Sequence, residues 1–242
     1  MRWAILSDIH GNLEAFRAVL DCLSNESIDR IAFLGDVVGY GANPNECIEI
    51  LKGITSVIVA GNHDYGAIGL ADTFNFNPVA RAAVEWTVNE LSAINRNYLS
   101  ELHLISIIDD ITFVHSTPYS PQNWGYLFYR DELDINFDSL QTRICFIGHS
   151  HIPAVFVRDE KRKTSISENL KVRMKEGESY IINVGSVGQP RDGIPDAAFG
   201  IYDTKECVFT LKRISYDIGI AQKKIIKAGL PERLAFRLII GR

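Results

Sequence analysis

The sequence predicts an α/β fold in which a single domain extends over residues 1–242. In the first third of the chain, short apolar runs alternate with amphipathic stretches, which is typical of parallel strands covered by helices. Further along, apolar runs follow one another closely, which favours antiparallel pairing. The chain has no linker, and 46% hydrophobic and 23% charged residues are ordinary globular values. We therefore expect one α/β domain with a mixed sheet system.

The N-terminal third contains three predicted strands and two predicted helices. Residues 3–6 and 31–34 are apolar runs, and the stretch between them carries apolar residues at helical spacing, namely Leu13, Phe16, Leu20 and Leu23. This pattern predicts a βαβ unit. Asn43 and Pro44 are typical of an N-cap and a first helical residue, and the apolar run at 57–60 completes a second unit.

The rest of the chain mixes helices and strands. Asn77 and Pro78 begin a helical stretch at about 77–102, and a basic, amphipathic helical segment at about 217–242 is expected to pack on the protein rather than on a membrane. The two residues at 109–110 are few enough to close a hairpin. Predicted strands lie at residues 104–108, 111–114, 144–147, 154–157, 180–184, 198–202 and 208–214.

Composition argues against several kinds of partner. A net charge of -5 leaves no basic surplus to attract polymeric nucleic acid. No apolar run approaches the roughly 18 residues of a membrane span, and we see no signal-peptide core, so we expect a cytoplasmic protein without a membrane partner. The four cysteines stand far apart and form no C-x-x-C pair, which argues against disulfides and against a cysteine zinc site.

Five of the six histidines stand at or just beyond the end of an apolar strand-like run. Acidic and amide side chains stand at the same positions, and glycines at 35, 61 and 148 allow the backbone to turn sharply there. Ligands of open α/β sheets bind beyond the carboxyl ends of the strands, so these side chains are expected to meet at one site. The candidate metal ligands are Asp8, His10, Asp36, Asn62, His115, His149 and His151.

A ligand set of imidazole, carboxylate and amide oxygen without thiolate suits Mn, Fe or Zn better than Ca or a structural zinc site. Seven ligands are too many for one such ion. Two ions about 3.5 to 4 Å apart need a shared carboxylate, and such pairs hold the attacking and leaving oxygens of an in-line displacement. Asp36, in the middle of the ligand order, is the predicted bridge. We expect two divalent transition-metal ions per chain, with Mn as first choice and Fe, Zn, Ni or Co as alternatives.

Taken together, these motifs resemble the calcineurin-like metallophosphoesterase superfamily. The matching residues are Asp8-Ile9-His10, Gly35-Asp36-Val37-Val38-Gly39, Gly61-Asn62-His63-Asp64, His115 and Gly148-His149-Ser150-His151. A later segment, Asn183 to Gly193, is similar to the small prokaryotic phosphodiesterase branch.

The resemblance implies a four-layer αββα sandwich with two mixed β-sheets. It also implies that Asp8, His10, Asp36 and His151 surround one ion, and that Asp36, Asn62, His115 and His149 surround the other. A hydroxide held between the ions would attack phosphorus. His63 would protonate or stabilise the leaving oxygen, with Asp64 as a candidate orienting carboxylate.

Weaker patterns point to substrate contacts. Asn12 either faces substrate or caps a helix, and the 183–193 segment offers backbone amides and Arg191 to a phosphate, or is a turn between strands. The aromatic segment 119–129 either stacks on a nucleobase or serves packing.

The predicted function is a dinuclear metal-dependent phosphoesterase, either a phosphodiesterase or a nucleotide phosphohydrolase, acting on a small phosphate ester or nucleotide. A dinucleoside polyphosphate hydrolase and a protein phosphatase are the enzymatic alternatives. An interaction scaffold on the same fold is the non-enzymatic alternative, which the complete set of ligands and His63 disfavours. The oligomeric state and the natural substrate stay open.

Overall fold

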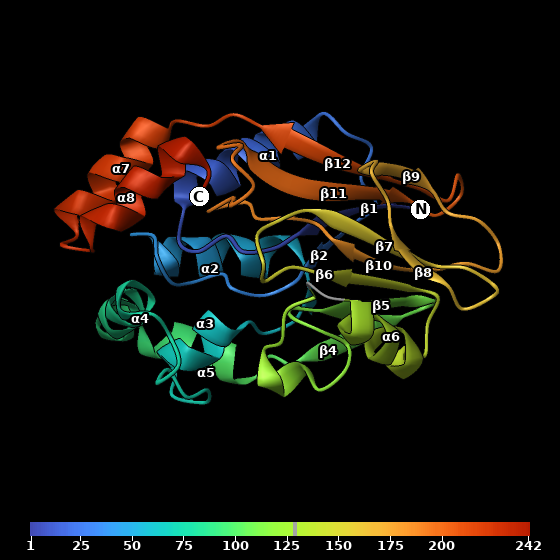
Figure 1. Ribbon diagram of the computed structural model, residues 1–242. Helices are drawn as coiled ribbons and strands as arrows, with labels where there is room; N and C mark the ends of the chain where they lie inside the picture. Colours follow the sequence, from blue (N-terminus) through green and yellow to red (C-terminus); the bar gives the residue numbers. More distant parts are fainter. Residues whose placement is uncertain (128–129) are drawn as a thin grey trace.

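A computed structural model describes residues 1–127 and 130–242 and shows two mixed six-stranded sheets flanked by helices (Figure 1). The first sheet contains, in spatial order, β3 (Val57–Ile58), β2 (Arg30–Phe33), β1 (Arg2–Leu6), β11 (Ala197–Asp203), β12 (Val208–Ile214) and β9 (Lys171–Arg173). β1, β2 and β3 are parallel, as the βαβ pattern predicts, whereas β11 pairs antiparallel with both β1 and β12.

The second sheet is formed by the middle of the chain. Its order is β4 (Ile105–Ile108), β5 (Ile111–Val114), β6 (Ile144–Ile147), β10 (Ser179–Asn183), β7 (Ala154–Arg158) and β8 (Thr164–Ile166). The predicted hairpin at 109–110 joins β4 to β5, and Asp109 takes a left-handed conformation there with φ 53°. The expected antiparallel pairing is found for β4 with β5, β10 with β7 and β7 with β8, whereas β6 is parallel to both β5 and β10.

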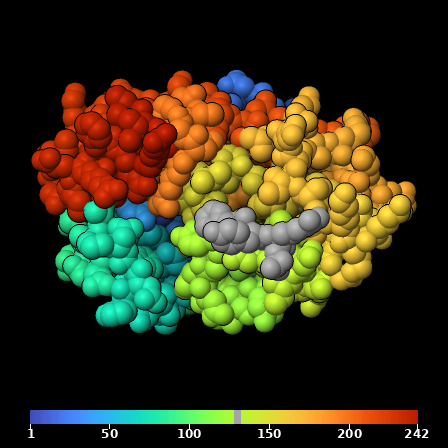
Figure 2. Space-filling view, in the orientation of Figure 1, coloured from blue at the N-terminus to red at the C-terminus, as the bar shows by residue number. Residues whose placement is uncertain are grey.

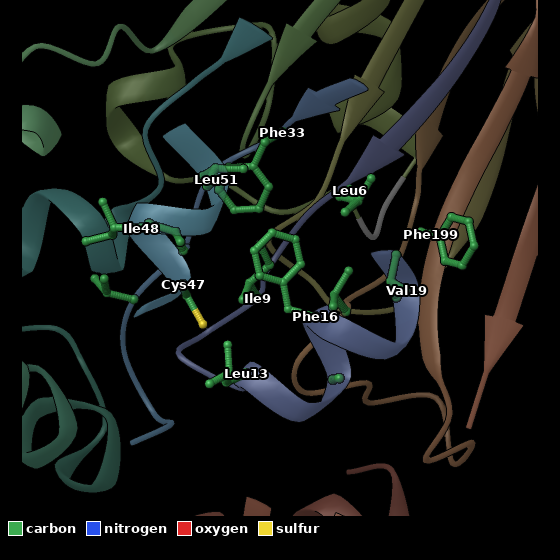
Figure 3. Close-up of a cluster of buried hydrophobic side chains, with 14 of the residues drawn as sticks. Leu6, Ile9, Leu13, Phe16, Val19, Phe33, Cys47, Ile48, Leu51 and Phe199 are labelled. Atoms are coloured by element: carbon green, nitrogen blue, oxygen red, sulfur yellow. The ribbon is translucent and has the colours of Figure 1, made fainter. Parts of the chain in front are cut away.

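Three apolar layers hold the two sheets and their helices together. Trp3 and Ile5 of the first sheet pack against Phe113 and Phe146 of the second, so a buried core fills the space between the sheets. The outer face of the first sheet is covered by α1 (Leu13–Ser24) and α2 (Pro44–Ile54), with Phe16 buried at the centre of the contact (Figure 3). The outer face of the second sheet is covered by α6 (Arg130–Ser139). These layers confirm the predicted αββα arrangement.

The remaining helices lie beside the sheets. They are α3 (Asn62–Ala67), α4 (Pro78–Glu90), α5 (Ala93–Ser100), α7 (Ile218–Lys227) and α8 (Glu232–Ile240), with a short 3₁₀ turn, η1, at Pro121–Asn123. The stretch expected to be one helix from 77 is two helices, because Leu91 and Ser92 are extended and the Ser92 hydroxyl accepts from the Asn95 amide to start α5. The C-terminal segment is likewise divided, at Gly229 with φ 72° and Pro231.

The C-terminal helices pack against α4 and against the turn that carries Tyr40. Buried residues of α7 and α8 contact Ala80 and Ala83 of α4 and the ring of Tyr40. In Figure 2 the red C-terminal helices lie directly against the teal segment that contains α4. Among the described residues, no helix is long and apolar enough to cross a membrane.

Candidate metal centre

The candidate ligands converge because five strands end at the same place. β1 leads to Asp8 and His10, β2 to Asp36, and β3 to Asn62 at the start of α3. In the second sheet, β5 leads to His115 and β6 leads to the next two histidines. All seven predicted ligands are buried: Asp8, His10, Asp36, Asn62, His115, His149 and His151.

The turns that present these ligands are conformationally costly. Five of the seven candidate ligands have left-handed backbones, with φ between 50° and 67°: Asp8, His10, Asp36, His149 and His151. A non-glycine residue in this region costs on the order of 1–3 kcal/mol and persists only where its surroundings enforce it. Such strain, concentrated at a cluster of polar side chains, is typical of a functional site.

Two glycines make room for the carboxylates. A Cβ atom on Gly61 would lie 2.0 Å from Asp36 Oδ1, and one on Gly148 would lie 2.5 Å from Asp8 Oδ2 and 1.9 Å from Ser7 Oγ. No side chain fits at either position without moving a candidate ligand. The G-N-H-D and G-H-x-H motifs therefore require their glycines because the carboxylates of other strands occupy the space.

The side-chain donor atoms lie close enough to share ions. His151 Nε2 is 3.2 Å from Asp8 Oδ1, and His10 Nε2 is 3.6 Å from both Asp8 Oδ1 and Asp36 Oδ2. On the other side of Asp36, His115 Nε2 is 3.2 Å from Asp36 Oδ2. Among the residues that the structure describes, three groups bring one donor atom of each member within 4.8 Å of the others: Asp8–His10–His151, His10–Asp36–His63 and Asp36–His115–His149.

Backbone carbonyls fix the tautomers of the histidines. The outer nitrogens contact carbonyl oxygens, at 2.9 Å for His10 Nδ1 and Val38 O, and at 2.7 Å for His115 Nδ1 and Leu34 O. His151 Nδ1 lies 2.6 Å from Gln189 O. A carbonyl only accepts, so each outer nitrogen carries a hydrogen, and in the neutral ring the inner Nε2 keeps its lone pair for a metal. His149 is reversed, because its Nε2 lies 3.0 Å from Trp124 O and leaves Nδ1 free.

Several buried polar atoms at the centre have no hydrogen-bond partner among the described residues. They include Asp8 Oδ1, Asn62 Oδ1 and His115 Nε2. Leaving a buried polar atom unpaired costs about 1–3 kcal/mol, and more when the group is charged. Carboxylate, amide and imidazole lone pairs that point inward together are what a divalent transition metal requires, so the residues fit such ions.

The chain matches the family model of the calcineurin-like phosphoesterase superfamily domain over residues 1–206. The chain belongs to this superfamily. This confirms the resemblance seen in the motifs, and the buried histidine and aspartate clusters are consistent with the metal binding typical of the family.

Other members of the superfamily share the whole fold. An uncharacterized protein of Methanocaldococcus jannaschii is 43% identical over 99% of this chain and 98% of its own length. A metallophosphoesterase from Sphaerobacter thermophilus, whose crystal structure is solved, is 39% identical with a TM-score of 0.88, covering 100% of this chain and 99% of that one. A hypothetical protein from Pyrococcus horikoshii has a TM-score of 0.81 at 21% identity, covering 100% and 98% of the two chains, and supports the fold alone.

Burial and charge set the protonation of this phosphoesterase-family centre. Burial alone would lower the pKa of His115, but the Asp36 and Asp8 carboxylates outweigh burial and raise it to about 9. Burial lowers the pKa of His149 to about 4, helped by the charge of His115. Burial, with the nearby Arg191 guanidinium, lowers the pKa of His151 to about 3. Two of these rings are therefore neutral at pH 7 and ready to donate a lone pair.

His63, the residue expected to assist the leaving group, lies beside the candidate ligands. Its ring centroid is 4.9 Å from that of His10 and 4.4 Å from that of Tyr40, and its Nδ1 has no hydrogen-bond partner among the described residues. Burial holds the pKa of His63 well below its usual range. At neutral pH the ring is thus uncharged and still carries one N–H donor.

Asp64 makes different contacts from the expected one. Its carboxylate oxygens accept hydrogen bonds from the backbone N–H groups of Asp36 at 2.7 Å, Gly61 at 3.0 Å and Val38 at 3.2 Å, and none from His63. Burial and the Asp36 carboxylate raise the pKa of Asp64 to about 7. The residue therefore joins the turns after β2 and β3 and positions Asp36, in place of orienting His63.

Asn12 acts as the N-cap of α1, which was the alternative to a substrate contact. Its Oδ1 accepts from the Ala15 amide at 3.1 Å, and its Nδ2 donates to Gly188 O at 2.8 Å and to Tyr216 Oη at 3.2 Å. Asn12 is only 5% exposed. Its side chain therefore holds α1 and the 183–193 segment together.

The backbone amides of the 183–193 segment also serve the fold. The amides of Val187 and Gly188 donate to Ser7 O at 2.9 Å and to Asp8 O at 2.8 Å. This segment supports the turn that carries Asp8 and, through Gln189 O, the ring of His151. Unlike these backbone amides, the Arg191 side chain faces a cleft. Its guanidinium lies over the Tyr40 ring at 5.6 Å, and the residue lines a cleft of about 290 Å³ together with His63.

Two contacts at the centre were not predicted by the sequence patterns. Tyr40 packs its ring against His10 at 4.6 Å, and its hydroxyl is 3.3 Å from Arg191 Nη2. A signal was available, since Tyr40 directly follows the G-D-x-x-G motif. Trp124 contributes a backbone carbonyl to His149, and no residue type encodes that contact.

Proposed function

We propose that this protein is a dinuclear metal-dependent phosphoesterase that hydrolyses a small phosphodiester or nucleotide. Asp8, His10, Asp36 and His151 would hold one ion, and Asp36, Asn62, His115 and His149 would hold the other. The observation that carries this assignment is the convergence of unpaired, buried donor atoms around Asp36, whose Oδ2 lies within 3.6 Å of histidine nitrogens from both groups.

Divalent ions bound there would activate water for attack on phosphorus and neutralise charge on the phosphate oxygens. We assign Mn as the first choice, with Fe, Zn, Ni or Co as alternatives, because the donor set mixes imidazole with carboxylate and amide oxygen. Asp64 holds the Asp36 backbone in place, and the carbonyls of Val38, Leu34 and Gln189 keep the ring lone pairs directed inward.

His63 assists the departure of the leaving oxygen in this proposal. Its ring lines the cleft, lies against Tyr40 and has the lowered pKa that burial produces. A neutral imidazole stabilises the developing negative charge by donating its N–H, and proton transfer by a positioned histidine contributes about 10²- to 10⁴-fold in rate.

Arg191 binds the phosphate at the same cleft. Its Nη2 lies 3.0 Å from Gln189 Oε1 and 3.3 Å from Tyr40 Oη, which leaves further guanidinium donors for an anion. Guanidinium groups form paired hydrogen bonds with phosphate oxygens. The Tyr40 hydroxyl thus sets the orientation of the cation that receives the substrate.

The alternatives differ in substrate rather than in site. A symmetrical bis(5'-nucleosyl)-tetraphosphatase of Coxiella burnetii is 37% identical over 62 residues, which is 25% of this chain and 21% of that protein. A likeness of this extent keeps dinucleoside polyphosphates among the substrates to be tested, together with phosphopeptides. The interaction scaffold is disfavoured because a chain without ions would bury Asp8 and Asn62 oxygens without partners.

The test is metal-dependent release of p-nitrophenol from bis-p-nitrophenyl phosphate, measured with Mn, Ni, Co, Fe and Mg. We expect His63→Ala to lower kcat by about 10²-fold or more while metal content stays near wild type. His103→Ala is the matched control, because His103 is exposed and lies outside the centre. Absence of turnover with every metal would refute the proposed function, and full activity of His63→Ala would remove its assigned role.

A further inference from the structure

Two loops form the wall of the cleft above the metal centre, and each contributes asparagine and aromatic side chains. The loop between α3 and α4 contributes Asn75 and Phe76, and the loop after β5 contributes Asn123, Trp124 and Tyr126. His63 and His149 line the same cleft. A substrate whose phosphate binds at the centre must therefore place one ester substituent against both loops.

Each loop sets an aromatic ring beside a histidine of the centre. The ring centroid of Phe76 is 4.9 Å from that of His63. On the other loop, Tyr126 stacks on His149 with ring centroids 4.2 Å apart and planes at 18°. Rings held in this way offer a surface on which a planar substituent can stack. Aromatic side chains stack well on nucleobases of every kind.

The same loops carry two side-chain amides that the fold does not use. Among the described residues, neither the Asn75 nor the Asn123 side chain has a hydrogen-bond partner, and both are exposed. By contrast, the neighbouring Asn77 accepts from the Ala80 amide at 2.9 Å and caps α4. A free carboxamide presents donors and an acceptor together, which matches the edge of a heterocyclic base.

We propose that this cleft is a nucleoside subsite, in which a base stacks on the rings of Phe76 and Tyr126 and is read by the amides of Asn75 and Asn123. The inference rests on the proposed function, because the phosphate of the same ligand binds at the metal centre and Arg191. The cleft volume of about 290 Å³ is at the low end for ligand pockets, so a single nucleoside arm fits and any second arm extends into solvent.

The rings and amides favour a nucleotide over other phosphate esters. An alkyl or glycerol arm gains nothing from stacking and has no edge for a carboxamide to read. A phosphopeptide needs an open groove with backbone partners, whereas this cleft offers side-chain amides on two loops and, among the described residues that line it, one guanidinium, that of Arg191.

The first experiment compares two inhibitors that share a phosphate and a ribose. With the manganese-loaded protein, adenosine 5′-monophosphate and ribose 5-phosphate compete against bis-p-nitrophenyl phosphate hydrolysis, and calorimetry measures their binding directly. We expect the adenosine ligand to bind at least about fivefold tighter, since stacking of one base is worth that much or more. Equal affinities in a protein that still hydrolyses the diester would overturn the subsite and leave the proposed function intact.

The second experiment tests whether the side-chain amides of Asn75 and Asn123 recognise the base. The double variant Asn75→Ala/Asn123→Ala is expected to reduce the preference for adenosine 5′-monophosphate over ribose 5-phosphate by about fivefold or more. Asn89→Ala, an exposed asparagine in α4 outside the cleft, is the matched control and should keep the full preference. An unchanged preference in the double variant would overturn the assignment of the amides. If the wild-type protein hydrolyses no diester, the proposed function itself fails.

Discussion

The metal centre forms the floor of the cleft, and the loops that carry Asn75 and Asn123 form its wall. These two regions are built in opposite ways. At the floor, buried side chains stand on strand ends with left-handed backbones, and the outer histidine nitrogens are paired with carbonyls. At the wall, Asn75, Asn123 and Tyr126 are exposed, and the two amides have no partner among the described residues. A rigid floor suits chemistry that is common to a superfamily, whereas an open wall suits selection among substrates.

Substitutions in the two regions should therefore have different effects. A change at the floor disturbs a cluster in which several strands meet, so it should alter metal content and turnover together. A change at the wall touches exposed side chains on loops, so it should alter the choice of ligand while metal content stays constant.

Asp36→Asn should have the largest effect. The Asp36 carboxylate lies 3.2 Å from His115 Nε2 and 3.6 Å from His10 Nε2, and it also accepts from the His63 amide at 2.8 Å. Loss of its charge should remove at least one ion per chain and several kcal/mol of transition-state stabilisation, or roughly 10³-fold in kcat. Plasma mass spectrometry gives the metal content and steady-state kinetics gives kcat. Wild-type values for both would show that Asp36 is no bridge.

Asp64→Asn should have an intermediate effect, through position rather than ligation. The variant keeps one carbonyl oxygen but weakens the three backbone contacts that hold the turns after β2 and β3. We expect a 10- to 100-fold loss of metal affinity, about that of other residues that position ligands. Restoration of turnover at high manganese concentration would support this role. A loss of turnover that no manganese concentration restores would instead indicate a direct part in the reaction.

Arg191→Gln tests the boundary between floor and wall. The guanidinium contacts Tyr40 and Gln189, and a protonated guanidinium has no lone pair for a metal, so the substitution should leave metal content unchanged. We expect kcat/KM to fall about tenfold, the effect of one charge-assisted hydrogen bond. Arg233→Gln, an exposed arginine of α8, serves as the control. A changed metal content in Arg191→Gln would place the residue at the floor.

Removal of the metals should make stability depend on pH. In the metal-free chain, the Asp36 and Asp8 carboxylates outweigh burial and raise the pKa of His115 to about 9, above its usual value of 6.5. A raised histidine pKa stabilises the folded chain fully below pH 6.5, and this stability is lost as the pH rises toward 9. The melting temperature of chelator-treated protein should therefore fall between pH 7.5 and 9. The manganese-loaded protein, in which the ring must be deprotonated, should lack this slope.

The strand ends were predictable from sequence because each is encoded locally. Asp36 and His149 each follow an apolar run and a glycine, and parallel pairing within each sheet brings such strand ends to one edge of that sheet. That the edges of the two sheets meet was not encoded locally. The role of Asp64 was not predictable, because its three partners are backbone amides from separate turns. The contact of the Trp124 carbonyl with His149 was not predictable either. Nor was the break at Ser92, where the side chain caps the start of a new helix inside a continuous helical pattern.

Anomalous diffraction from a manganese-soaked crystal tests the central claim most directly. The account predicts two manganese peaks per chain, one among Asp8, His10 and His151 and the other among Asp36, His115 and His149, with Asp36 contacting both. A single peak that does not touch Asp36, or manganese found only outside these residues, would contradict it.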